Sequence, residues 1–338
     1  MLDCLRKIDG GLLEMASGDG RILVSNALQG RVFAAFGTEI IHRFVRELAE
    51  HPDPVEFNNL GGNSLWPAPE GGDFAFNDPP DGDWRVQPGI NSVPTVTVSA
   101  TPEKVTVRKE IELLNRRNIS LRLEFRRTVS PLRETELPAA PGLLLTGYRT
   151  HDALVPLGRY RTADALLAAW TLEQFPGAEG ITAFGRCQGP AAGCANDDFY
   201  GSAAERLAYD GRTFTFALGG PSRLQIGLKA ASRPELIGAI DPNRGTLVIR
   251  QTPPRSDGTY FNIADNDQAT GPFGAADMFS IFNGSQELDF HELETIAPLC
   301  ADADGFLLPS TLESTSLLLK GDPDRLAAFL ADTFQIRL

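Results

Sequence analysis

The sequence predicts a mainly β fold, a large antiparallel β-sandwich with two or three peripheral helices. Residues 95–129 alternate apolar and polar side chains over three segments rich in Val, Ile and Thr, the pattern of strands with one buried face. Turn signals rich in Gly, Pro, Asn and Asp recur about every ten residues, as they do in all-β proteins. About fifteen strand-like segments stand against two or three helical ones, so we expect a single sandwich domain over residues 1–338.

The first third of the chain combines a predicted extension, hairpin, helix and loop. Residues 1–20 form an N-terminal extension, and residues 21–36 bend between two apolar stretches. Residues 38–51 carry apolar side chains at helical spacing, and we interpret His42 beside that stripe as a packing or surface residue. Residues 58–94 are dominated by turn-forming residues, which predicts a long ordered loop folded over the body.

The rest of the chain is predicted to add strands and one last helix. Residues 163–175 begin Ala-rich and then alternate, so we assign a strand to their second half. Asp322 caps a C-terminal helix over residues 322–334, with Pro323 at its first position and one apolar stripe. Further short strands are expected at residues 224–228, 247–251, 259–263, 278–282 and 288–296.

Composition and charge exclude several functions. An apolar fraction of 42% with twenty Phe indicates a globular chain. The net charge of −13 argues against binding to nucleic acid or to an anionic membrane, both of which need a basic surface. A neutral or cationic small ligand suits this charge better.

Targeting and cofactor signals are also lacking. No segment resembles a signal peptide or a membrane span, so we expect a cytoplasmic protein, or a periplasmic one if a leader was removed. Four Cys are too few for a disulfide framework, and whether Cys187 and Cys194 pair stays open. A P-loop, a dinucleotide fingerprint, a G-x-S-x-G elbow and an H-E-x-x-H motif are absent from the sequence, so we expect no metal and no cofactor.

Residues 57–74 hold the first candidate binding residues. Four glycines bracket a Trp-Pro-Ala-Pro-Glu core, so turn chemistry is expected to set the backbone there. An indole offers an apolar face to a sugar ring, and amide and carboxylate groups match sugar hydroxyls. The alternative is a buried connection whose Trp belongs to the core. The candidate sugar ligands are Asn63, Trp66 and Glu70, with Trp84 from the same long loop.

The segment DFHELETIAP carries a second set of candidates. Read as a strand, it places Glu292 and Glu294 on one face and His291 on the other. Two carboxyl groups on an enclosed face perturb each other and raise one pKa toward the range useful for proton transfer. The alternative is a solvent-facing strand that ends in two glutamates.

Four features follow one another along the chain: a W-P-A-P-E-G-G loop, a β-rich body, a WTLEQFPG segment and a late LET-x-x-P strand. In this order they resemble the galactose mutarotase-like (aldose 1-epimerase-like) superfamily, most closely an uncharacterised branch of it. The resemblance covers approximately residues 20–320 and implies the supersandwich fold. In the family's well-known enzymes a Glu in such a LET segment is the base, which implies this role for Glu294. The family's acidic His lies in an N-H-x-Y-F-N-L segment that this chain lacks, so His151 and His291 are the remaining candidates for the acid.

Three functions fit these features. The first is a carbohydrate-binding protein that acts as an aldose epimerase at the anomeric carbon, with Glu294 as base and Arg149 or Lys229 as a clamp for an acidic sugar. The second is a non-catalytic carbohydrate-binding module, favoured by the missing His. The third is a polysaccharide lyase or glycoside hydrolase that uses Tyr148, Tyr260 or the glutamate pair. The expected partner is a small-molecule sugar, and the oligomeric state stays open.

Overall fold

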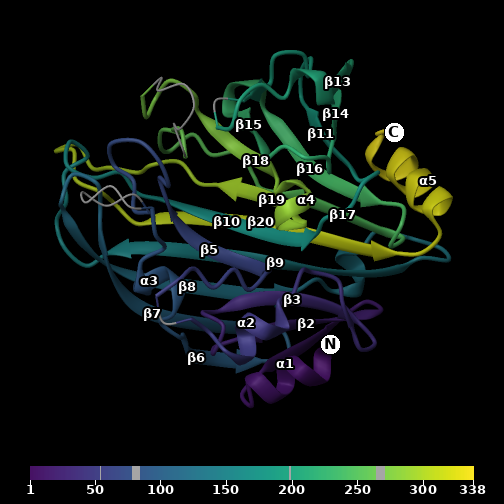
Figure 1. The fold of residues 1–338 in the computed structure, drawn as a ribbon, viewed down its shortest axis with the longest axis horizontal. Coiled ribbons are helices and arrows are strands. Elements are labelled where there is room, and N and C mark those ends of the chain that lie inside the picture. Colours follow the sequence, from purple (N-terminus) through teal and green to yellow (C-terminus); the bar gives the residue numbers. More distant parts are fainter. Residues whose placement is uncertain (54, 78–83, 198, 264–270) are drawn as a thin grey trace.

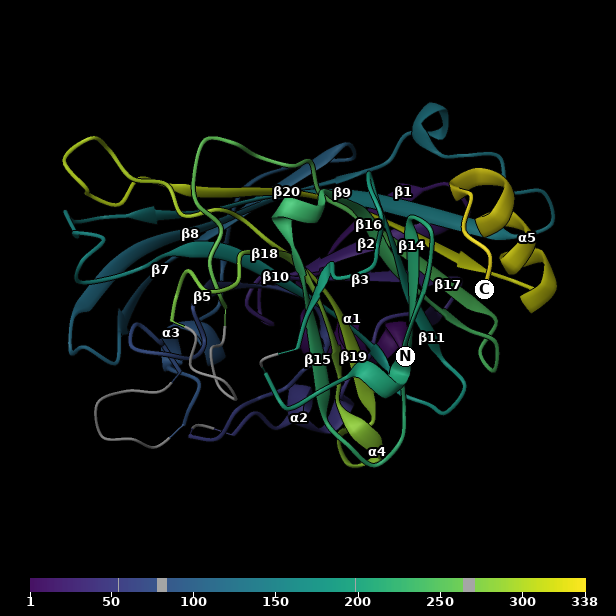
Figure 2. The same cartoon turned by 90° about the horizontal axis from the view of Figure 1, so that it is seen from above.

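The fold is a sandwich of two antiparallel sheets, which confirms the predicted fold class. The computed structural model describes residues 1–53, 55–77, 84–197, 199–263 and 271–338, and in this part of the chain each sheet has ten strands. Figures 1 and 2 show the sheets packed face to face along the long axis of the molecule. Within the described residues, no helix is long and apolar enough to span a membrane.

Sheet I runs in the order β1-β2-β3-β5-β10-β19-β18-β15-β12, with β4 paired to β3. Its central strands combine segments from the beginning, middle and end of the chain. Its strands are Leu13–Ser17 (β1), Gly20–Ser25 (β2), Arg31–Phe36 (β3), Glu39–Ile40 (β4), Gly62–Ala68 (β5), Ala168–Pro176 (β10), Ala195–Asn196 (β12), Leu224–Lys229 (β15), Asp277–Asn283 (β18) and Phe290–Ile296 (β19).

Sheet II runs in the order β13-β14-β11-β16-β17-β20-β9-β8-β7-β6. The three strands predicted within residues 95–129 are its last three. Its strands are Val96–Thr101 (β6), Lys104–Leu114 (β7), Ser120–Pro131 (β8), Leu144–Pro156 (β9), Thr182–Cys187 (β11), Leu207–Asp210 (β13), Thr213–Ala217 (β14), Pro234–Asp241 (β16), Thr246–Gln251 (β17) and Ser310–Lys320 (β20).

Short helices near the two ends of the chain cover part of the outer faces of the sandwich. The predicted C-terminal helix is confirmed: the carboxylate of Asp322 accepts hydrogen bonds from the N–H groups of Asp324 and Arg325, and the helix packs beside β17 (Figure 1). At the other end, Leu2 and Leu5 pack on Phe33 of sheet I. The helices are Leu2–Ile8 (α1), Arg46–Glu50 (α2), Pro88–Asn91 (α3), Ser285–Leu288 (α4) and Pro323–Phe334 (α5), with 3₁₀ turns at Glu134–Glu136, Ala204–Arg206 and Ala230–Ser232.

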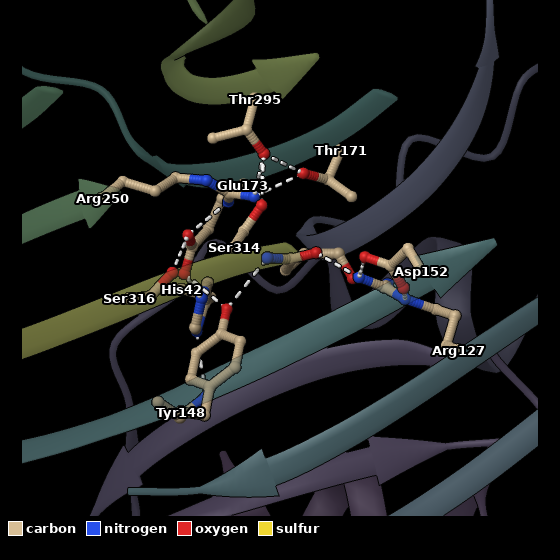
Figure 3. A network of polar contacts seen from close by, with 12 residues as sticks. His42, Arg127, Tyr148, Asp152, Thr171, Glu173, Arg250, Thr295, Ser314 and Ser316 are labelled. Carbon is tan, nitrogen blue, oxygen red and sulfur yellow. Dashed lines mark hydrogen bonds and ion pairs between the residues drawn. The ribbon is translucent and has the colours of Figure 1, made fainter. Parts of the chain in front are cut away.

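A buried polar network joins the two sheets behind the middle of sheet I (Figure 3). The carboxylate of Glu173 on β10 accepts hydrogen bonds from Arg250, His42, Tyr148 and Ser316, and all of these side chains are buried. Burial alone would raise the pKa of Glu173, but the charge of Arg250 and the hydrogen bond from His42 outweigh it and lower the pKa to about 2. The group is therefore an ionised carboxylate that links strands of both sheets.

A second part of the network is centred on Arg127 of β8. Its guanidinium pairs with Asp152 of β9, with Nε 2.7 Å from Oδ1, and donates to the side-chain oxygen of Asn63 at 2.7 Å. Asn63 in turn donates from Nδ2 to the hydroxyl of Tyr148 at 3.0 Å. Because a buried charge is costly unless paired, these contacts fix how sheet I sits on sheet II.

The long loop expected at residues 58–94 was wrong in one part, because β5 and α3 lie inside it. β5 pairs with β10 along its whole length, and Pro67 lies opposite Ala169. Proline cannot donate to a ladder, but the carbonyl of Ala169 accepts from the N–H of Ala297, and the N–H of Ala169 donates to the hydroxyl of Ser310, so both backbone groups of Ala169 are satisfied. The Gly and Pro residues of this segment favoured the prediction of a loop, although β5 is a central strand of sheet I.

The helix expected at residues 38–51 was also wrong for most of its length. The segment forms the short strand β4, then an irregular stretch, then α2. Ile40 packs with the N-terminal helices while Ile41 packs between the sheets, so neighbouring side chains face opposite ways, as in a strand.

Two smaller expectations also need correction. Within the described residues, the segment expected as a strand at residues 259–263 makes one isolated bridge, between Thr259 and Leu299. The N-terminal extension is not separate from the sandwich, because β1 pairs with β2 at the edge of sheet I.

Candidate functional site

A cavity of about 690 Å³ opens on the outer face of sheet I, over β5, β10, β19, β18 and β15. Strand alternation decides which side chains reach it. On β19, Phe290, Glu292 and Glu294 line the cavity, whereas His291 and Leu293 point to the other face. The predicted placement of the two glutamates on one face, with His291 on the other, is therefore what the structure has.

The register of sheet I arranges the floor of the cavity in rows. One row places Ser64, Leu172 and Glu294 side by side on β5, β10 and β19, and the next places Gln174 beside Glu292. Ser280 on β18 lies opposite Glu294. Polar groups thus occupy the middle of the floor.

Aromatic side chains flank these polar rows. Trp66 and Trp170 lie next to each other with ring centroids 6.1 Å apart, and Phe57 packs on Trp66 and on Trp84. Trp84 is 55% exposed and forms part of the rim. Tyr200, Phe282 and Phe290 form the opposite wall, with centroids 5.4 to 6.0 Å apart between neighbours. Such rings provide flat apolar faces on both sides of a polar floor.

Glu294 is held by one donor from β10, the adjacent strand, and one from β15, two strands away on the other side. The indole Nε1 of Trp170 donates to its Oε2 at 2.8 Å, and Nε2 of Gln225 lies 3.3 Å from its Oε1. Burial raises the pKa of Glu294 well above its usual range, and the charge of Glu292 adds to this rise. Both effects favour the protonated form of this carboxyl group.

Glu292 is held by Gln174, whose Nε2 donates to Oε1 at 2.6 Å. The guanidinium of Arg43 lies 3.2 Å from the amide oxygen of Gln174, which fixes the orientation of that amide. Burial raises the pKa of Glu292 to about 7; the hydrogen bond from Gln174 opposes the rise, and the charge of Glu70 adds to it. Two buried carboxyl groups whose pKa values are both raised, one of them to near neutrality, can give and take protons.

Glu70 is the third carboxyl group of the cavity. It follows β5, and its backbone N–H donates to the carbonyl of Ile263. Burial raises its pKa, against hydrogen bonds from Trp84 and Asn77. Among the described residues, no cluster of three or more His, Cys, Asp or Glu side chains has the arrangement of a metal site.

The structure brings together five of the residues named from the sequence: Trp66, Glu70, Trp84, Glu292 and Glu294. The other five lie elsewhere, for reasons that are visible in their strands. They are Asn63, Arg149, His151, Lys229 and His291.

Asn63 faces sheet II, because it alternates with the cavity-lining residues Ser64 and Trp66 on β5. Lys229 ends β15 and donates to the carbonyl of Gly193. His291 is buried on the inner side of β19, and burial lowers its pKa to about 4.

His151 and Arg149 project from the solvent face of sheet II. His151 on β9 is exposed, and the guanidinium of Arg149 lies 3.5 to 3.7 Å from the carboxylates of Glu136 and Glu313. They are therefore not positioned to act on a molecule in the cavity. The two tyrosines named for a lyase also lie apart from it: Tyr148 is buried in the network between the sheets, and Tyr260 contacts the backbone of Arg255.

Sequence reasoning missed several lining residues. Trp170 and Gln174 lie in a segment that was correctly predicted to be a strand. Strand alternation would have placed both side chains on one face, opposite to Glu173, and both line the cavity. Arg31 and Gln225 offered no local signal, because only the pairing of distant strands brings them to the cavity. Asn59 lies in the segment 57–74 but was not named as a candidate.

Comparison with known proteins adds the family and the fold. The family of unknown function DUF6786 matches residues 2–338. The chain belongs to this family. No curated protein matches the chain.

Among solved structures, the Slr1438 protein of Synechocystis sp. PCC 6803 is similar with a TM-score of 0.52 and 14% identity, over 92% of this chain and 96% of that one. A candidate aldose 1-epimerase of Escherichia coli K12 is similar with a TM-score of 0.50 and 13% identity, over 91% and 98% of the two chains. At these identities the likeness establishes the galactose mutarotase-like sandwich fold.

Proposed function

We propose that this protein binds a monosaccharide in the cavity of sheet I and interconverts its anomers by acid–base chemistry. The observation that carries the proposal is the pairing of Glu292 and Glu294 on one cavity face between two aromatic walls. The fold shared with the candidate aldose 1-epimerase supports the same reaction class.

Binding would use the two kinds of surface in the cavity. The indole of Trp84, which is 55% exposed at the rim, offers an apolar face to a pyranose ring, and the largely buried Trp66 and Trp170 line the same cavity. Gln174 and Gln225 offer amide groups to its hydroxyls. The side-chain oxygen of Asn59 is buried beside the cavity without a hydrogen-bond partner among the described residues. A sugar hydroxyl would satisfy it.

The chemistry would use the two glutamates in different protonation states. Glu292, as a carboxylate, takes the proton of the anomeric hydroxyl while the bond between the anomeric carbon and the ring oxygen breaks. Glu294, as a carboxylic acid, gives its proton to the ring oxygen, which leaves an open-chain aldehyde. Rotation about the adjacent carbon–carbon bond and the reverse transfers close the ring as the other anomer. This assignment reverses the role expected for Glu294, because burial and the charge of Glu292 favour its protonated form, whereas the hydrogen bond from Gln174 and the charge of Arg43 favour the carboxylate form of Glu292.

Binding without catalysis is the second candidate. The observation that favours it is that none of the four His lines the cavity in the part of the chain that the structure describes. A protein that only binds would hold sugar without changing the rate of anomer exchange.

NMR exchange spectroscopy on a panel of aldoses separates the two candidates. We expect faster exchange between the anomers of at least one sugar, and we expect Glu294→Gln to abolish the acceleration while the sugar still binds. If the wild-type protein binds sugar but does not accelerate anomer exchange, the epimerase proposal is refuted and a non-catalytic sugar-binding protein remains. Release of reducing ends from a polysaccharide would instead support a hydrolase.

A further inference from the structure

One end of the cavity carries a buried positive charge without a close negative partner. Arg31, the first residue of β3, lines the cavity and is 3% exposed. Its Nη1 donates to the carbonyl of Gly61 at 2.6 Å, and its Nε lies 3.4 Å from the amide oxygen of Gln29. In the described part of the chain, Nη2 has no hydrogen-bond partner and no carboxylate lies within 4.0 Å of the guanidinium. A buried guanidinium in this state has an unused donor.

The surroundings of Arg31 add positive charge. Its pKa is lowered to about 9, mainly by burial and then by the charge of Arg127; the charge of Glu292 opposes this shift, and the charge of Arg43 adds to it. Burial and the charge of Arg31 lower the pKa of Lys109 to about 7. Its Nζ donates to the carbonyls of Gly89 and Val93 and lies over the ring of Phe125. Arg127 has its own counter-ion in Asp152.

The carboxyl groups of the cavity do not remove this excess. Burial favours the neutral forms of Glu70 and Glu294, and the charge of Glu292 acts on Arg31 without a direct contact. The guanidinium, with a pKa of about 9, stays charged at neutral pH. The fixed charge in the empty cavity is therefore positive at the β3 end. An oxyanion placed there would gain a charge-assisted hydrogen bond from Nη2.

The geometry connects this end to the glutamate pair. Val32 pairs with Asn63 in antiparallel register, which puts Arg31 beside Ser64, in the same row as Leu172 and Glu294. Three strand spacings separate the backbones of Arg31 and Glu294, about 14 Å in all. Both side chains line the same cavity, so one ligand in it can contact both.

We propose that Arg31, with the hydroxyl of Ser64 beside it, forms an oxyanion subsite, so that the cavity selects a monosaccharide with a carboxylate or phosphate group away from its anomeric carbon. This inference rests on the proposed sugar-binding function and names its substrate class. The two glutamates act on the anomeric carbon, and Arg31 holds the anionic end of the same molecule.

Calorimetric titration of the full chain with glucose, glucuronate and glucose 6-phosphate tests the subsite. We expect at least one of the two anionic sugars to bind about tenfold more tightly than glucose, the effect of one charge-assisted hydrogen bond. A preference for glucuronate would identify a carboxylate as the group held, and a preference for glucose 6-phosphate would identify a phosphate.

Variants at two arginines complete the test. Arg31→Gln is expected to abolish the preference, so that the anionic sugar binds about as tightly as glucose. Arg31→Lys is expected to keep part of the preference because it keeps the positive charge. Arg149→Gln is the matched control, since Arg149 lies on the solvent face of sheet II, and it is expected to leave the preference unchanged. Circular dichroism checks that each variant is folded, and Arg31→Lys carries the test if Arg31→Gln does not fold.

The outcomes separate this inference from the function it rests on. Binding of glucose as tight as that of both anionic sugars, or a preference that survives Arg31→Gln, would overturn the oxyanion subsite while the sugar site stands. Binding of none of the three sugars would overturn both proposals.

Discussion

The indole of Trp170 donates a hydrogen bond to the carboxyl group of Glu294 across two neighbouring strands, with Nε1 2.8 Å from Oε2. The same ring lies against Trp66 in the aromatic wall. One side chain therefore joins the surface proposed to bind sugar to the group proposed to transfer a proton.

Replacing Trp170 by Phe should shift the pH dependence of anomer exchange. The ring is kept, but the hydrogen bond that lowers the pKa of Glu294 is lost, so this pKa rises further. Because Glu294 acts as the acid, the loss of activity at high pH should move to higher pH. Rates measured across the pH range check this shift. Trp66→Phe is the control, and an equal shift in that variant would contradict the role of the hydrogen bond.

Replacing Glu292 by Gln should stabilise the protein at high pH while it removes activity. The pKa of Glu292 is raised to about 7 in the folded protein, above its usual value, so folding favours the protonated form. The free energy of unfolding therefore falls as the pH rises from the usual pKa of glutamate through 7. The Glu292→Gln variant has no titrating group at this position and does not show this loss. We expect a gain on the order of 1 to 3 kcal/mol in the free energy of unfolding at pH 8 and none at pH 4. Urea unfolding measures it, and an equal effect at both pH values would argue against the raised pKa.

Replacing Glu173 by Gln should destabilise the sandwich strongly. Arg250, buried beside it, would lose its carboxylate partner, and removal of one member of a buried pair costs about 3 to 5 kcal/mol. The pKa of Glu173 is lowered to about 2, so its contribution is present above its usual pKa and is lost as the pH falls toward 2. Thermal unfolding from pH 7 to pH 2 measures both effects. The exposed Glu313→Gln is the control, and a similar loss in that variant would contradict the special role of the network.

Replacing His151 by Ala should leave sugar binding and anomer exchange unchanged. His151 is exposed on the solvent face of sheet II, and the cavity lies on the outer face of sheet I. Trp66→Ala, by contrast, should weaken sugar binding at least tenfold, since it removes a ring of the aromatic wall. Loss of activity in the His151 variant would show that the chemistry occurs elsewhere.

Much of the fold could be predicted from the sequence because alternation is a local signal. Lys104–Leu114 and Ser120–Pro131 alternate cleanly, since one face is buried against sheet I and the other is solvated. β5 could not be predicted, because it is buried on both faces and its Gly and Pro residues mimic a loop. The helix expected at residues 38–51 failed because tertiary packing on both sides of Ile40 and Ile41 outweighed helical spacing.

The candidate site could be predicted where it depends on the alternation of side chains between the two faces of one strand. Glu292 and Glu294 were placed on one face by their spacing alone, and the structure has them there. Asn63 was misplaced because its strand was not predicted. In a strand, Asn63 and Trp66 are three residues apart and face opposite sides of the sheet. Arg31 and Gln225 reach the cavity only through the order of strands in sheet I, which no local pattern encodes.

A crystal structure with the best-binding sugar of the panel tests the central claim most directly. We predict that the sugar lies between the aromatic walls, with its anomeric hydroxyl within hydrogen-bond distance of Glu292 and its ring oxygen within the same distance of Glu294. A sugar bound in another cavity, or one bound here with its anomeric carbon turned away from both glutamates, would contradict the account.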